Sequence, residues 1–439
     1  MNRKAMQRLI AWKSAKKRLP LVIRGARQVG KTWLMQTFGR EHFPSVAYVN
    51  FDNNAQMRTL FEGDFDIPRL LAGLQLETGV KITPKTLLIF DEAQEVPKAL
   101  ASLKYFRENA PEYAILASGS MLGIALHEGT SFPVGKVDFL DLRPLDFDEV
   151  LDALGAAELA ELLRRPEPDW TLVKAFGGRF AGRLRQYLFL GGMPEVVATF
   201  AEGGDYREAQ AVQRRILDAY EQDFSKHAPH AVVPRIRMLW QGVPAQLARE
   251  NRRFVYGSLR HGARAKDFEL AMQWLRDCGL LHRVDCVSKP ALPLSAYRAS
   301  AFKLFMGDVG LLACASGLDA GTLLDGSRLF TEFKGALTEQ FVAQELVASG
   351  LTPYYWSNPD GISEVDFVVQ ANGEIIPIEV KAAENLRSKS LKTYCEKYSP
   401  ARCVRASLSD YREESWLVNV PLYGLRACLA ARRRVTTRL

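Results

Sequence analysis

The order of apolar and polar positions predicts strands and helices in alternation up to about residue 150. Apolar runs typical of strands occupy residues 19–24, 86–92 and 113–120, and helical patterns follow them. Short strands that are apolar throughout are buried on both faces, as in parallel sheets with crossover helices. We therefore predict an α/β fold with a parallel sheet for residues 1–150, preceded by a short amphipathic helix at the basic N-terminus.

The pattern is helical from residue 151 to residue 231, which predicts a lid of helices over a ligand of the first domain. Residues 232–325 show two short helical segments, a glycine-containing turn and a strand at 280–287, an order typical of a winged helix. The second of these helices has an apolar face formed by Phe268, Met272 and Leu275.

The last segment, residues 326–439, combines helical patterns with a predicted β-hairpin. The pair Asn372-Gly373 is a strong signal for a two-residue turn between strands at 362–371 and 374–381. This mixture predicts a small α/β domain at the end of the chain.

Residues 25–32 match the phosphate-binding loop G-x-x-x-x-G-K-[ST] of nucleoside triphosphatases. The motif stands between a predicted strand and a predicted helix, as its chemistry requires. Glycines let backbone N–H groups point at phosphate, Lys31 reaches the β- and γ-phosphates, and Thr32 offers a hydroxyl to Mg²⁺. The predicted ATP-binding residues of this loop are Gly25, Ala26, Arg27, Gln28, Val29, Gly30, Lys31 and Thr32.

Asp91 and Glu92 complete the expected ATP site. They end the apolar run at 86–92, and ligands bind at the carboxyl ends of strands in an open α/β sheet. Asp91 is expected to hold Mg²⁺, and Glu92 to polarise the attacking water.

The strand at 113–120 ends in the hydroxyls of Ser118 and Ser120. Either is placed to sense the γ-phosphate, and either is equally suited to cap a helix that follows. No arginine finger is assigned, because the candidates are suggested by position alone; they are Arg143, Arg183 and Arg185.

The register of the predicted hairpin brings acidic side chains together. Asp366 is expected opposite Glu379, and Glu364 opposite Lys381, all on one face because side chains alternate along a strand. Facing carboxylates roughly 5 Å apart repel each other unless a cation lies between them. A divalent metal would serve, with Lys381 orienting water or steadying a phosphate oxygen. The alternative is a surface hairpin with cross-strand charge pairs.

A third acid, Glu339, stands in the helical segment at 333–349. It shares one face of that helix with Ala336, Ala343 and Leu346. A carboxylate on an apolar face is costly unless it has a partner. Glu339 is therefore a candidate metal ligand together with Asp366 and Glu379.

Composition and charge narrow the class of protein. The chain has 439 residues, 47% of them hydrophobic, and no apolar run approaches the roughly 20 residues that cross a bilayer. Six cysteines without C-x-x-C spacing favour reduced thiols, and the absence of a signal-peptide pattern leads us to expect a cytoplasmic protein without membrane contact.

The formal net charge of +8 favours a polyanionic partner, above all DNA. Basic residues are dense at 249–266 and at 432–438. In a winged helix, Arg264 and Lys266 would contact DNA, whereas the alternative is a winged helix used for protein contacts.

These residues together resemble a prokaryotic family of AAA-type P-loop ATPases with a C-terminal domain of unknown function. The segments that carry the resemblance are GARQVGKT, LLIFDEAQ, YLFLGGMPEVV, FKLFMGDVGLLA and SEVDFVV with IPIEVKA. The family usually has Gly-Arg where this chain has Gly135-Lys136, and the Pro of the nuclease motif is Val365 here.

The resemblance implies an AAA-type P-loop ATPase core, a helical lid, a winged helix and a restriction-endonuclease-like α/β end of the PD-(D/E)xK type. These four domains are expected at residues 1–150, 151–231, 232–325 and 326–439. The nuclease superfamily implies roles for Glu339, Asp366, Glu379 and Lys381.

The leading hypothesis is an ATPase that uses Mg²⁺ and whose nucleotide state controls a DNA-binding, nuclease-type C-terminal half, in a monomer or a homo-oligomer. The alternative is a non-catalytic ATP-dependent switch whose nuclease-like domain only docks DNA or protein. A third hypothesis is a toxin-like or defence ATPase triggered by a partner.

Overall fold

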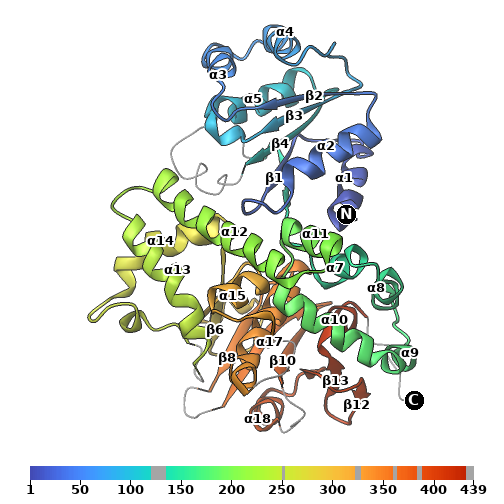
Figure 1. Ribbon diagram of the computed structural model, residues 1–439, viewed down its shortest axis with the longest axis vertical. Helices are drawn as coiled ribbons and strands as arrows, with labels where there is room; N and C mark the ends of the chain where they lie inside the picture. The colour runs from blue at the N-terminus through green and yellow to red at the C-terminus, as the bar shows by residue number, and fades with distance from the viewer. Residues whose placement is uncertain (120–134, 250–252, 322–327, 359–362, 383–387, 432–439) are drawn as a thin grey trace. The chain divides into compact units, whose positions relative to one another are not determined.

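The computed structural model describes residues 1–119, 135–249, 253–321, 328–358, 363–382 and 388–431. Ser120, the helix expected after it and the basic run at 432–438 lie outside the described residues. Contacts within the chain divide it into two units. The first unit consists of residues 1–143 and 273–280, and the second unit consists of residues 144–272 and 281–439. Each unit has its own sheet (Figure 1).

The first unit is built on a parallel sheet with the strand order β2-β3-β4-β1-β5. Its strands are β1 (Leu21–Arg24), β2 (Ser45–Asn50), β3 (Thr86–Asp91), β4 (Ala114–Gly119) and β5 (Asp138–Asp141). β3 and β4 are buried along their whole length, as their apolar sequences predict. Because the strands are parallel, the carboxyl ends of β1, β4 and β3 lie side by side at one edge of the sheet.

The helices of the first unit are α1 (Lys4–Lys13), α2 (Lys31–His42), α3 (Ala55–Glu62), α4 (Ile67–Thr78) and α5 (Pro97–Asn109). α1 confirms the short N-terminal helix. Three buried rings, Phe51, Phe61 and Phe90, meet edge to face with centroids 5.4–5.9 Å apart. This packing holds the end of β3 immediately before Asp91.

The second unit contains a mixed sheet with the strand order β12-β13-β11-β10-β9-β8-β6-β7. Its strands are β6 (Leu281–Val287), β7 (Arg298–Met306), β8 (Tyr354–Ser357), β9 (Glu364–Ala371), β10 (Glu374–Val380), β11 (Val404–Ser407), β12 (Arg412–Glu413) and β13 (Val418–Pro421). β6 pairs directly with β8, so strands from both sides of the expected boundary at residue 325 share one sheet. Separate winged-helix and nuclease-like domains stay predictions.

The helices of the second unit include those predicted to form a lid. They are α7 (Phe147–Ala153), α8 (Ala157–Arg164), α9 (Trp170–Ala175), α10 (Gly177–Leu190), α11 (Pro194–Gly203), α12 (Tyr206–His227), α13 (Val233–Leu247), α15 (Val309–Ala315), α17 (Arg328–Ala348), α18 (Lys389–Tyr398) and α19 (Leu425–Ala430). α10 contacts α15 and α17, and α12 contacts α15. The residues expected to form the lid therefore pack with the C-terminal half, and α14 (Ala265–Asp277) has residues in both units.

The predicted hairpin is confirmed. β9 and β10 pair antiparallel with Ala371 facing Glu374 and Phe367 facing Ile378, which is the register derived from the turn. Asn372 and Gly373 have φ angles of 52° and 82°, as a two-residue turn of type I′ requires.

Two segments of the family resemblance meet inside the second unit. The N–H of Gly192 donates to Asp308 Oδ2 at 2.7 Å, and Asp308 Oδ1 accepts from the N–H of Leu311 in α15 at 3.0 Å. A Cβ at Gly191 would lie 2.0 Å from Asp308 Oδ1, so only glycine fits there. Burial raises the pKa of Asp308 to about 6. These residues form a structural junction between helices.

A second buried carboxyl holds the start of α7. Glu345 Oε1 in α17 accepts from the N–H of Phe147 at 3.1 Å, and Arg426 in α19 pairs with Asp146. Burial, with the nearby charges of Asp146 and Asp148, raises the pKa of Glu345 to about 8.

Cysteine chemistry differs from the expectation. Cys395 and Cys403 are joined by a disulfide, so the prediction of reduced thiols is wrong for this pair. These cysteines are eight positions apart in sequence, and the turn after α18 brings them together. Within the described residues, no helix is long and apolar enough to cross a membrane.

Candidate functional site

The phosphate-binding loop joins β1 to α2. Gly30, the residue before α2, has a φ of 88°, and Gln28 has a φ of 64°, so the backbone curls as the motif predicts. Gly25 has a φ of 153°, and a Cβ there would lie 2.0 Å from the carbonyl oxygen of Leu142. The loop therefore needs glycine where it passes the chain that follows β5.

Lys31 lies over this loop. Its ammonium donates to the carbonyl oxygens of Gly25 and Ala26, at 3.0 and 2.8 Å. Burial lowers the pKa of Lys31 to about 8, although Glu92 and Asp91 act in the opposite direction. An anionic ligand beside this ammonium would stabilise its charged form.

The Asp91 carboxylate accepts hydrogen bonds from several parts of the ATP site. Thr32 Oγ1 donates to its Oδ2 at 2.6 Å, and the hydroxyl of Tyr48 donates to the same oxygen at 3.0 Å. Ser118 Oγ and the N–H of Glu92 donate to Oδ1, the latter at 3.1 Å. The carboxylate is 2% exposed and is oriented by groups from the P-loop, β2 and β4.

Mg²⁺ fits the donors of this site. Thr32 Oγ1 and Asp91 Oδ2 are hard oxygen atoms 2.6 Å apart, the ligand type that Mg²⁺ prefers. The motif residues are thus brought together as expected for a metal held between the loop and the end of β3.

Glu92 follows Asp91 with a φ of 51°, a left-handed conformation that is uncommon for a residue with a side chain. Its Oε2 accepts from Gln94 Nε2 at 2.7 Å. Strained residues of this kind concentrate at functional positions because the surrounding structure keeps a side chain aimed at its target.

Two residues near the site escaped sequence reasoning. Tyr48 reaches Asp91 from the neighbouring strand. The pKa of its phenol is raised, mainly by burial and in addition by the negative charge of Asp91. Arg3 donates to the carbonyl oxygens of Val29 at 3.2 Å and Arg143 at 2.6 Å, which ties the P-loop to the chain after β5. Neither belongs to a motif; the strand order reveals Tyr48, and the position of the N-terminus beside the P-loop reveals Arg3.

The arginine-finger candidates remain unassigned. Burial lowers the pKa of Arg143, and the backbone carbonyl oxygen of Arg143 accepts a hydrogen bond from Arg3. Arg183 donates to Gln186 at 2.8 Å, and Arg185 is exposed, both on α10. Lys136, which stands where the family has arginine, pairs with Glu108 at 2.9 Å.

The C-terminal carboxylates form two groups. In the first, Lys381 Nζ is 2.6 Å from Glu379 Oε1, and the N–H of Val380 donates to Asp366 Oδ2 at 2.8 Å. Glu379 Oε2 also accepts from the N–H of Leu391 at 3.3 Å. Burial raises the pKa of Glu379, Lys381 lowers it, and Asp366 raises it further.

In the second group, Glu364 and Glu339 share a residue that sequence reasoning did not single out. Lys303 Nζ lies 2.8 Å from Glu364 Oε1 and 3.7 Å from Glu339 Oε2. Glu364 therefore has an ion pair with Lys303 in place of the pairing with Lys381 that its facing position suggested. Among the described residues, no three His, Cys, Asp or Glu side chains are grouped to hold a metal. The metal-binding role of Glu339, Asp366 and Glu379 stays a prediction.

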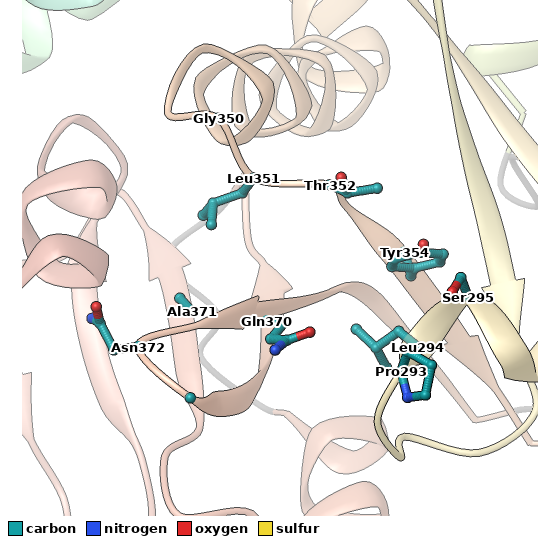
Figure 2. Close-up of a pocket in the computed structure, with 11 residues that line it drawn as sticks. Pro293, Leu294, Ser295, Gly350, Leu351, Thr352, Tyr354, Gln370, Ala371 and Asn372 are labelled. Atoms are coloured by element: carbon teal, nitrogen blue, oxygen red, sulfur yellow. The ribbon is translucent and has the colours of Figure 1, made fainter. Parts of the chain in front are cut away.

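A cavity of about 340 Å³ lies at the turn end of the same hairpin. Figure 2 shows Gln370, Ala371 and Asn372 on one side of it and Thr352 and Tyr354 on another. Its lining contains no charged side chain. Because Asp366 and Glu379 stand at the other end of β9 and β10, the cavity is separate from the carboxylates.

Exposed basic residues lie before and at the start of α14. Arg260, Arg264 and Lys266 are exposed, whereas Phe268 and Met272 are 2% and 3% exposed. The predicted apolar face of this helix is confirmed, because Phe268, Met272 and Leu275 are buried. Its contact with DNA stays a prediction.

Family models match three parts of the chain. Residues 17–151 match an AAA domain, residues 181–322 a domain of unknown function (DUF8612), and residues 334–423 a domain of unknown function (DUF4143). The resemblance to AAA-type ATPases with a C-terminal domain of unknown function is thus confirmed. Curated proteins offer no match to this chain.

Solved structures resemble the chain at low sequence identity. The Walker-type ATPase PABY2304 of Pyrococcus abyssi is 14% identical with a TM-score of 0.45, over 72% of this chain and 95% of that chain. The ORC2 protein of Aeropyrum pernix, in its ADPNP–ADP complexes, is 15% identical with a TM-score of 0.34, over 78% and 93%. The ORC1 protein of Aeropyrum pernix in complex with DNA is 12% identical with a TM-score of 0.29, over 72% and 92%.

Proposed function

We propose that the first unit binds and hydrolyses ATP with Mg²⁺. The observation that carries this proposal is the 2.6 Å contact between Thr32 of the P-loop and Asp91 at the end of β3. It joins a phosphate-binding loop to a carboxylate, the two parts that nucleotide hydrolysis requires at one place. The match to an AAA domain over residues 17–151 supports it.

Each residue has a task in this proposal. The N–H groups of the P-loop and the dipole of α2 hold the phosphates, and Lys31 binds the β- and γ-phosphates. Mg²⁺, when bound, neutralises the charge that develops on these oxygens, and Thr32 and Asp91 would hold it. Glu92 accepts the proton of the attacking water.

The test is steady-state ATP hydrolysis by the full chain. Lys31→Ala should reduce hydrolysis to background, whereas Lys85→Ala, a change at an exposed lysine immediately before β3, should leave it unchanged. Hydrolysis by Lys31→Ala at the rate of the Lys85→Ala control would refute the proposed site.

For the second unit, we propose ATP-controlled docking of DNA. The net charge of +8 and the exposed Arg260, Arg264 and Lys266 support a polyanionic partner. Because α10 and α12 pack on α15 in this unit, a movement of these helices with nucleotide state would be passed to the sheet. Salt-dependent binding of a DNA duplex, weakened in Arg264→Ala with Lys266→Ala, is the expected result. Equal binding by that variant would refute docking through α14.

A second candidate is phosphodiester cutting, which the proximity of Asp366, Glu379 and Lys381 favours. The test is cleavage of supercoiled and branched DNA with Mg²⁺ or Mn²⁺, with and without ATP. Loss of cutting in Lys381→Ala would establish this activity, and Lys31→Ala would show whether ATP controls it. No cutting under any condition, with ATP hydrolysis intact, would leave the docking function.

A further inference from the structure

Lys303 is a lysine inside the second unit, with a side chain that is 1% exposed. It belongs to β7, and the residues on either side of it, Phe302 and Leu304, are buried as well. Removing an ammonium from water is so costly that carboxylates must compensate it. The surroundings of Lys303 therefore show what compensates its charge.

Two carboxylates and an aromatic ring surround this ammonium. Nζ lies 2.8 Å from Glu364 Oε1 and 3.7 Å from Glu339 Oε2. It also stands over the ring of Tyr355, 5.0 Å from the centroid. Cation–π attraction adds to the two ion pairs because the Lys303 ammonium is buried.

Arg253 completes the group. Its Nε lies 3.4 Å from Glu364 Oε2, and its guanidinium donates to Ser357 Oγ. These contacts of the described residues therefore set two basic side chains, Lys303 and Arg253, against two acidic ones, Glu339 and Glu364. Glu339 is 3% exposed, so water contributes little to stabilising its carboxylate.

This balance differs from what a divalent cation needs. A metal site requires carboxylates whose charge is left for the metal, and an ammonium 3.7 Å from Glu339 already uses that charge. A divalent cation next to Lys303 would also be repelled by it. The remaining acids, Asp366 and Glu379, have Lys381 among them, which leaves that group with one net negative charge.

We propose that Lys303 is the resident cation of the Glu339 and Glu364 carboxylates, in the place of the divalent metal that a nuclease-like end implies. The residues present do not fit a metal at Glu339. This inference does not depend on ATP hydrolysis by the first unit. It means that the second unit recognises its partner without a metal held by Glu339.

The first experiment counts Mn²⁺ ions bound to the full chain without nucleotide, by electron paramagnetic resonance. Wild type, Glu339→Gln and the exposed control Glu269→Gln are compared. The expected result is the same number of bound ions in all three proteins. Fewer ions in Glu339→Gln than in Glu269→Gln would overturn the proposal, because Glu339 would then be a metal ligand.

The second experiment removes the internal cation. Lys303→Met keeps an unbranched side chain one atom shorter than lysine but leaves the carboxylates short of one positive charge, and Lys289→Met is the same change at an exposed lysine. We expect Lys303→Met, and not Lys289→Met, to bind about one additional Mn²⁺ ion per chain. A folded Lys303→Met without additional Mn²⁺ would overturn the proposal. If Lys303→Met does not fold, the comparison of Glu339→Gln with Glu269→Gln decides alone.

Discussion

Tyr48 offers a sharp test of how the ATP site is built, because it touches the proposed metal ligand and belongs to no motif. Its hydroxyl donates to Asp91 Oδ2 at 3.0 Å, and the same oxygen accepts a hydrogen bond from Thr32 Oγ1 at 2.6 Å. Tyr48→Phe removes one oxygen atom and keeps the ring. Asp91 then keeps its contacts with Thr32 and Ser118 but loses the support from β2.

The size of the effect follows from the type of bond. A hydrogen bond to a charged group contributes about 1.5–3 kcal/mol, and outer partners of metal ligands change metal affinity or activity about 10- to 100-fold. Tyr48 is only partly buried, so the lower end applies. A loss of about 1.5 kcal/mol corresponds to a roughly tenfold higher Mg²⁺ concentration for half-maximal hydrolysis.

The assay is ATP hydrolysis at saturating ATP over a range of Mg²⁺ concentrations, together with binding of a fluorescent ATP analogue in EDTA. We expect Tyr48→Phe to shift the Mg²⁺ dependence and to leave metal-free nucleotide binding unchanged. Tyr113→Phe is the matched control, because Tyr113 stands before β4 at the amino end of the sheet. If both variants need the same Mg²⁺ concentration, Tyr48 does not position Asp91 for the metal and the reasoning fails.

Three further predictions follow from the same geometry. Glu92→Gln should bind ATP like wild type but hydrolyse it about 10²–10⁴ times more slowly, and weakened binding in a filter assay would contradict its role toward water. Burial lowers the pKa of Lys31 to about 8, so its side chain is mostly neutral at pH 8.5, and ATP binding at that pH should make it take up a proton. Calorimetry in two buffers that differ in ionisation enthalpy should then give different binding enthalpies. Equal binding enthalpies would contradict this proton uptake. The pKa of Glu345 is raised to about 8, so the folded state binds more protons than the unfolded state below that pH, and stability should rise as pH falls from 8.5 to 6.5. The measurement is the unfolding temperature at pH 8.5 and at pH 6.5, and the difference between the two should be smaller in Glu345→Gln than in wild type. The same difference in both proteins would refute the role of Glu345.

Short stretches of sequence were enough to predict those parts of the fold whose structure depends on a few consecutive residues. The P-loop, β3 with Asp91 and the turn at Asn372-Gly373 each depend on a few consecutive residues, and the structure has them where the patterns place them. The hairpin register was accessible for the same reason, because a two-residue turn determines which residues face each other.

Contacts across strands were not accessible in this way. Tyr48 meets Asp91 because β2 is the neighbour of β3, and that order depends on how the crossover helices pack. The pairing of β6 with β8 likewise joins segments separated by α15 and α17. Sequence patterns describe each segment well but contain no information about its neighbour in the sheet.

Lys303 and Glu339 show the limit most clearly. Glu339 on an apolar helix face requires a partner, and that requirement was visible in the sequence. Lys303 stands in β7 between buried residues, so the two-residue alternation that would mark a solvent-facing lysine is absent there. Each residue alone is costly to bury, whereas together they compensate each other. The sequence therefore defines a charge that needs a partner, and only the arrangement of α17 against β7 brings the Lys303 ammonium within 3.7 Å of it.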